Sequence, residues 1–170
     1  KGSAVETLVT LAAITGARLG ELMQLEVSDV KVMDGIAYVD INDDGDGNTL
    51  KNKYSRRVVP LVDGALDFDL KAFTIGLPAE GKLFNFTKDK AGRDFRYLQQ
   101  RADADGEGLT FHSLRHSMAG RLKAADVALT TAQAILGHSS NSITYDHYGK
   151  GAAAELVKMH DAIKESFGIQ

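Results

Sequence analysis

The residues of this chain best suited to chemistry are a late tyrosine, Tyr148, and the basic side chains that precede it. Two short segments, H-S-L-R and L-G-H-S, supply His112, Arg115 and His138. A further arginine, Arg18, lies far upstream at the start of a predicted helix. A phenol accompanied by guanidinium and imidazole groups suits attack on a phosphodiester, because two arginines match the two non-bridging oxygens of one phosphate. Such a clamp stabilises the doubly charged transition state more than the ground state, which is electrostatic catalysis without a metal.

Helical spacing predicts which of these side chains meet. Glu21 follows Arg18 by three residues, so it either orients Arg18 or forms an ordinary surface ion pair with it. His112 and Arg115 have the same spacing near a helix N-terminus, where the helix dipole favours an anion. His112 could accept the proton of the tyrosine, since imidazole titrates near neutral pH. We expect His116 to point elsewhere and to be structural or solvated.

In order and spacing, these motifs closely resemble the catalytic domain of the tyrosine recombinases, the phage integrase family. The motifs are T-G-A-R-L-G-E-L at 15–22, H-S-L-R at 112–115, L-G-H-S at 136–139, and Tyr148 followed by Gly149. The resemblance implies a site-specific recombinase or integrase that cleaves and rejoins DNA through a 3′-phosphotyrosyl intermediate, without metal, ATP or any cofactor. It also implies two kinds of partner, double-stranded DNA and other protomers of the same protein in a synaptic assembly.

The resemblance also implies a role for each site residue. The nucleophilic tyrosine lies about nine residues after the histidine of L-G-H in this family; Tyr148 lies ten after His138, and Tyr145 is the alternative. His138 would donate a hydrogen bond to the scissile phosphate, although a lone histidine there is more often a capping residue. A hairpin lysine would protonate the departing 5′-oxygen. Lys51, in L-K-N-K-Y-S-R-R-V-V-P-L, fits best, Lys53 is the alternative, and both could be solvated strand charges.

The pattern of the whole chain predicts a mainly α fold with a small antiparallel β-sheet, an α+β class. Residues 36–41 alternate as a strand, 42–48 are a turn, and 54–61 return as the second strand. Helices are predicted at 3–13, 19–25, 66–75, 88–103, 112–124, 127–136, 140–147 and 152–166.

The final predicted helix carries an apolar stripe of Leu156, Met159, Ile163 and Phe167. Such a stripe usually packs against its own domain. In the family that the chain resembles, however, a segment after the tyrosine often docks onto a neighbouring protomer. The sequence leaves both arrangements open.

Length and composition favour one domain over residues 1–170, since the chain has 170 residues and 44% hydrophobic content. The first residue is Lys1, and the resemblance implies that the parent protein has a preceding DNA-binding domain that is absent here. The chain has no cysteine, which excludes disulfides and thiolate catalysis. No apolar run and no leader indicate a membrane or export, so we expect a soluble protein in the cytoplasm of a bacterial or phage-infected cell.

The formal net charge of −3 argues mildly against a nucleic-acid partner. The distribution of charge matters more, because basic residues cluster in two stretches that could form one basic face. These residues are Lys51, Lys53, Arg56 and Arg57, then Lys88, Lys90, Arg93, Arg96 and Arg101.

Three other functions would use some of the same residues. A type IB topoisomerase-like relaxase would make the same covalent link and then religate the same strand. A catalytically inactive DNA-binding module would keep the fold, but the expected residue types are all present. A metal-dependent nuclease would need carboxylates clustered beside the histidines, and the sequence shows none there. A calcium loop at 44–48 is not favoured either, because Thr49 and Ser55 replace the required Gly and Glu.

Overall fold

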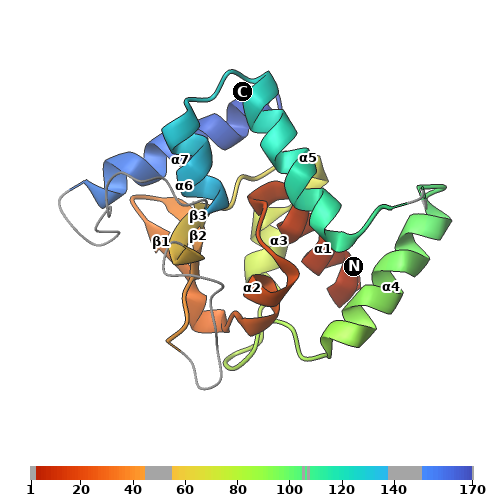
Figure 1. Cartoon of the computed structure of the whole chain (residues 1–170). Coiled ribbons are helices and arrows are strands. Elements are labelled where there is room, and N and C mark those ends of the chain that lie inside the picture. Colours follow the sequence, from red (N-terminus) through yellow and green to blue (C-terminus); the bar gives the residue numbers. More distant parts are fainter. Residues whose placement is uncertain (1–2, 45–54, 105, 107, 138–150, 170) are drawn as a thin grey trace.

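In the computed structural model, the described residues are 3–44, 55–104, 106, 108–137 and 151–169. They form a mainly helical fold with one small sheet, as predicted (Figure 1). The sheet lies on one side of the helices and α4 on the other. In chain order the elements are α1 (Ala4–Thr15), α2 (Leu19–Gln24), η1 (Val27–Asp29), β1 (Val30–Met33), β2 (Ile36–Ile41), β3 (Arg57–Pro60), η3 (Ala65–Asp67), α3 (Leu70–Ile75), α4 (Lys88–Arg101), α5 (Phe111–Ala124), α6 (Leu129–Leu136) and α7 (Ala152–Ser166).

The first helix begins and ends at residues that cap it. The Ser3 hydroxyl accepts a hydrogen bond from the Glu6 backbone N–H, and the Glu6 carboxylate accepts one from the Ser3 N–H, which together form a capping box. Gly16 ends the helix with a φ of 66°. A Cβ at Gly16 would lie 2.6 Å from Leu136 Cδ2, so glycine permits both the left-handed turn and the close approach of α6. This turn brings Arg18 to the start of α2.

The sheet has three antiparallel strands in the order β1-β2-β3. Strand β2 was predicted at its observed bounds, and its Val39 lies opposite Val59 of β3. The returning strand is shorter than the predicted 54–61, because pairing with β2 begins only at Arg57. Strand β1 was not predicted, because its four residues, V-K-V-M, are too few to show a clear alternation of apolar and polar side chains.

The last helix packs against its own domain. Leu156, Met159 and Ile163 are buried, and Phe167 packs partly buried against the same core. The helix contacts β3, α6 and α5. Of the two arrangements that the sequence left open for this stripe, the structure therefore has the one within the chain.

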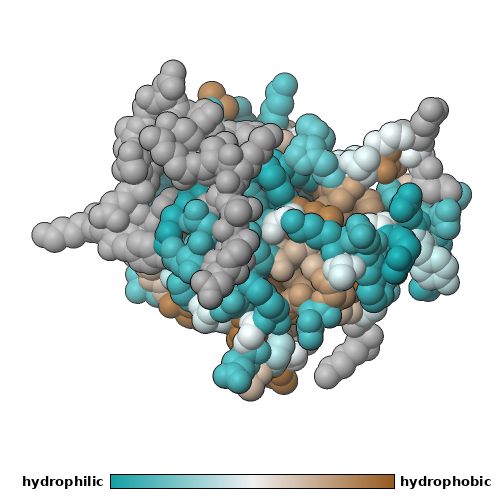
Figure 2. Space-filling view, turned by 60° about the horizontal axis from the view of Figure 1, so that its bottom comes forward, coloured by the Kyte–Doolittle hydropathy of each residue, from teal (hydrophilic) through white to brown (hydrophobic). Residues whose placement is uncertain are grey.

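Charged side chains cover the outer face of α4. Figure 2 shows that hydrophilic residues surround a smaller hydrophobic area on the face seen there. All five basic residues of this helix are exposed, namely Lys88, Lys90, Arg93, Arg96 and Arg101.

Among the described residues, no helix combines the length and the apolar character that crossing a membrane requires.

Candidate functional site

The start of α2 joins Arg18 to Glu21. Arg18 is the N-cap residue, and its backbone N–H donates to Glu21 Oε2 at 2.8 Å. Its guanidinium donates from Nη1 to Glu21 Oε1 at 2.6 Å. The predicted contact between the two side chains is therefore present. The Glu21 side chain is 5% exposed and that of Arg18 is 23% exposed, so the carboxylate is buried while the guanidinium still reaches solvent.

A second arginine, Arg57, contacts the same carboxylate. Arg57 Nη2 donates to Glu21 Oε2 at 3.0 Å. Burial by itself would raise the pKa of Glu21, but the charge of Arg57 and hydrogen bonds from Arg57 and Arg18 outweigh it and hold that pKa below its ordinary value. Glu21 is therefore an anion at neutral pH, shared between two cations.

The third arginine of the site, Arg115, comes from α5. It is 4% exposed, and its Nη1 donates to the Gly16 carbonyl oxygen at 2.8 Å. Its Nη2 is buried and has no hydrogen-bond partner within the described part of the chain. Burial, followed by the positive charges of Arg18 and Arg57, lowers the pKa of Arg115 to about 10. Arg115 stays protonated at neutral pH and has donors to spare.

These contacts bring four side chains from α2, β3 and α5 together. Arg18, Arg57 and Arg115 carry three positive charges and Glu21 one negative charge, so the group has a formal excess of two positive charges. An anion placed beside it would be attracted and would find the unsatisfied donor of Arg115. The arrangement therefore suits an anionic group such as a phosphate.

The two histidines of α5 lie on one face of the helix. His112 lies on the first turn of the helix and is exposed. His116 does not point elsewhere: its ring packs edge-on against that of His112, with centroids 4.8 Å apart. The prediction was wrong because residues four apart on a helix share a face, just as residues three apart do. The expectation that His116 is solvated holds, since it is exposed.

Several predicted site residues fall outside the described residues. These are Lys51 and its alternative Lys53, His138, Tyr148 and its alternative Tyr145, and most of the turn at 42–48. Gly137 does end α6, as predicted, with a φ of 65°.

Sequence reasoning did not identify Arg57 as part of the site. It was assigned to a surface basic stretch, whereas the side chain is 2% exposed. The available signal was its position directly before the apolar run V-V-P-L, which is buried. A strand residue that begins such a run is often buried itself, but the sequence does not indicate which acid would neutralise it.

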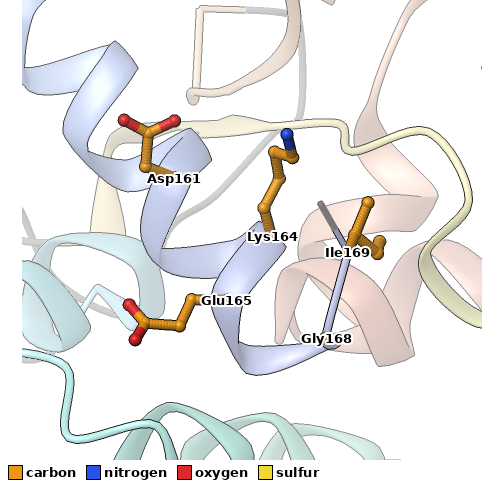
Figure 3. Close-up of a pocket in the computed structure, with 5 residues that line it drawn as sticks. All are labelled: Asp161, Lys164, Glu165, Gly168 and Ile169. Atoms are coloured by element: carbon orange, nitrogen blue, oxygen red, sulfur yellow. The ribbon is translucent and has the colours of Figure 1, made fainter.

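A pocket at the end of α7 lies apart from this site (Figure 3). Its lining residues are Asp161, Lys164, Glu165, Gly168 and Ile169. In the close-up the side chains of Asp161 and Lys164 extend to one side of the helix and that of Glu165 to another, and the lining includes none of the three arginines. The pocket offers no convergent set of groups for catalysis.

Comparison with known proteins gives consistent matches. Residues 3–155 match the model of the phage integrase family. The tyrosine recombinase XerD of Staphylococcus epidermidis is 31% identical over 170 residues, which cover 91% of this chain and 52% of that protein. The chain thus spans about half the length of the curated relatives it matches.

Two solved structures share the fold. The integrase from mycobacterium phage Brujita has a TM-score of 0.65 at 18% identity, covering 100% of this chain and 55% of that one. The XerH site-specific recombinase bound to difH substrate has a TM-score of 0.60 at 22% identity, covering 90% and 48%. Because the family model spans most of the sequence, from before Arg18 to beyond Arg115, the chain belongs to the phage integrase family.

Proposed function

We propose that this chain is the catalytic domain of a tyrosine-type site-specific DNA recombinase that needs neither metal nor ATP. The observation that carries the proposal is that Arg115 Nη2 is buried without a hydrogen-bond partner among the described residues, while the charge of Arg18, from α2, is near enough to lower the pKa of Arg115. Glu21 is one anion among three arginines, so the remaining positive charge is costly without a further anion. A scissile phosphate is the anion that fits a pair of guanidinium groups.

Within this proposal, Arg18 and Arg115 clamp the non-bridging oxygens of the phosphate. The Tyr148 oxygen attacks phosphorus, its proton passes to His112, and the bond from phosphorus to the 5′-oxygen breaks. Lys51 protonates that oxygen, which leaves a 3′-phosphotyrosyl link and a free 5′-hydroxyl. The 5′-hydroxyl of a second strand then attacks the link, so the energy of the broken bond is retained and no ATP is required.

Two further residues support the clamp. Glu21 orients Arg18 through the two hydrogen bonds at the start of α2. His138 would donate a hydrogen bond to the phosphate from the segment that follows Gly137. Neither group needs to exchange a proton with the substrate.

Double-stranded DNA is the proposed substrate, and other protomers are the proposed partners in strand exchange. Lys88 Nζ lies 3.6 Å from where a Cβ of Gly20 would stand, so the basic face of α4 begins beside α2. A basic surface next to the clamp supports contact with the DNA backbone beside the scissile phosphate. The XerH recombinase, solved bound to its difH substrate, supports this choice by its shared fold.

Covalent trapping on nicked DNA in EDTA tests the proposal. The DNA substrate carries the protein's own recombination site. The intact chain should form a DNA–protein adduct, Tyr145→Phe should retain it, and Tyr148→Phe should lose it. Adduct loss only in Tyr145→Phe would move the nucleophile to that residue. A requirement for Mg²⁺ would contradict metal independence.

The same trapped complex distinguishes recombination from relaxation. A second labelled duplex with a free 5′-hydroxyl should be joined to the trapped strand at the recombination site. Relaxation of supercoiled plasmids that lack the site would instead indicate a topoisomerase-like enzyme. Absence of any adduct on the nicked substrate would leave a non-catalytic DNA-binding module as the function.

A further inference from the structure

Arg57 is a buried cation to which the proposed reaction assigns no role. Its side chain is 2% exposed, so it cannot reach a DNA strand that lies on the surface. Burial lowers the pKa of Arg57 and the charge of Glu21 opposes this effect, which keeps the guanidinium charged. A buried arginine is stable only when its donors are matched by acceptors, so its contacts indicate what it holds.

The guanidinium of Arg57 binds three parts of the chain that surround the clamp. Its Nη2 donates to Glu21 at 3.0 Å, its Nη1 to the Ser55 carbonyl at 2.8 Å, and its Nε to the Ile135 carbonyl at 2.8 Å. These acceptors belong to α2, to the residues before β3, and to α6. Three bonds from one planar group fix the relative positions of all three segments.

The contact with Glu21 determines how that carboxylate is shared. Glu21 Oε2 accepts from both Arg57 Nη2 and the Arg18 backbone N–H, whereas Oε1 accepts from Arg18 Nη1. Without Arg57, Glu21 Oε2 would keep the bond from the Arg18 backbone N–H and could accept a second hydrogen bond from the Arg18 guanidinium. A bidentate pair would neutralise Arg18 and turn it away from a bound anion. Arg57 therefore leaves Arg18 with donors for the phosphate.

The contact with α6 is equally close. A Cβ on Gly137 would lie 2.8 Å from Arg57 Nη1 and 3.0 Å from Arg57 Cδ, so the guanidinium packs directly on the backbone where α6 ends. The residue after Gly137 is His138, which the proposed function assigns to the phosphate. Arg57 thus touches the backbone at the start of the segment that leads to this histidine.

We propose that Arg57 is a positioning residue: it sets the direction of the Arg18 guanidinium through Glu21 and fixes the end of α6 through Ile135 and Gly137. The inference rests on the proposed function, because it states how the phosphate clamp is held. It adds a residue that contacts neither the phosphate nor the reacting atoms.

The test compares single-turnover cleavage of two nicked substrates by Arg57→Met. One substrate carries the ordinary scissile phosphate, and the other carries a neutral methylphosphonate there, which makes less demand on an arginine. We expect Arg57→Met to cleave the ordinary substrate about 30-fold more slowly than the unmodified chain, a loss somewhat below that for removing a direct donor. On the methylphosphonate the loss should shrink to roughly threefold, because the clamp then contributes less.

The control is Ile163→Ala, which weakens the core in α7 without removing any of the three hydrogen bonds of Arg57. Both variants are assayed at a temperature at which circular dichroism shows them folded. If Arg57 has only a structural role, each variant should slow cleavage of the ordinary substrate and of the methylphosphonate by the same factor. Selective recovery on the methylphosphonate by Arg57→Met alone supports the inference.

Arg57→Lys covers the case in which Arg57→Met does not fold. Lysine keeps the charge beside Glu21 but lacks the planar fork, so we expect a smaller loss, roughly five-fold, with the same recovery on the neutral substrate. A folded Arg57 variant that cleaves the ordinary substrate at the unmodified rate would overturn the inference and leave the proposed function standing. Failure of the unmodified chain to form any adduct would overturn both.

Discussion

Arg115 is buried near other cations, and its Nη2 has no hydrogen-bond partner among the described residues, which is unfavourable for a charged group. Burial and the neighbouring arginines lower the pKa of Arg115 to about 10. A base whose pKa is lower in the folded state costs stability at every pH below that value, because the folded protein disfavours the charged form. The cost is therefore fully present at neutral pH. An anion bound beside Arg115 would remove it.

We predict that Arg115→Met raises the free energy of unfolding at pH 7 by about 1 to 3 kcal/mol, although the bond to Gly16 is lost. Urea unfolding measures this change. Sulfate should stabilise the unmodified chain and have little effect on the variant. Arg121→Met is the matched control on the same helix, where the arginine is exposed and lies over the Phe167 ring. Equal destabilisation of both variants would show that the buried charge has no net cost.

At the scale of elements, the junction between α6 and β3 depends on a glycine. Gly137 has a φ of 65°, and its backbone lies against the Arg57 guanidinium. Gly35, in the turn between β1 and β2, has a φ of 79°, but a Cβ there would meet nothing within 4 Å. Both glycines thus have a left-handed backbone, but the Arg57 guanidinium lies against Gly137, whereas a Cβ on Gly35 would have space around it.

Gly137→Ala should therefore cost more than Gly35→Ala. The left-handed backbone costs alanine about 1 kcal/mol at either position. At Gly137 the added methyl also displaces Arg57, so we expect a total loss of about 3 kcal/mol in the free energy of unfolding, with slower cleavage. Thermal denaturation of both variants is the measurement. Similar losses at the two glycines would mean that Arg57 moves aside freely.

At the scale of the whole molecule, α7 closes the core against β3, α6 and α5. Its buried stripe includes Ile163, which is 0% exposed, and Val157 on the same helix is 42% exposed. The last helix is therefore part of the same folded unit as the sheet and the clamp.

We predict that Ile163→Ala lowers the free energy of unfolding by about 3 kcal/mol, and that Val157→Ala changes it by less than about 0.5 kcal/mol. Since the stripe packs within the chain, the unfolding midpoint should not vary with protein concentration. Chemical denaturation at two concentrations a hundredfold apart checks both statements. A midpoint that rises with concentration would indicate docking onto a neighbouring protomer instead.

Much of the fold was predictable because local signals are strong in this chain. Ser3 and Gly16 mark the ends of α1, and Gly137 ends α6. Strand β1 was missed because its four residues, V-K-V-M, are too few to show a clear alternation, and His116 was misjudged because side chains three and four residues apart lie on one face of a helix. Local signals therefore predicted the ends of these helices, but neither strand β1 nor the contact of His116 with His112.

By itself, the sequence determined the pairing of Arg18 with Glu21, since three residues of helix suffice to bring them together. Only the tertiary structure decided that Arg57 joins them, that Arg115 is buried, and that the α7 stripe packs within the chain. The deciding hydrogen bonds link residues 36, 78 and 99 positions apart. Such contacts form when the core excludes water from distant segments, and a buried cation then binds whichever acceptor the packing brings near it.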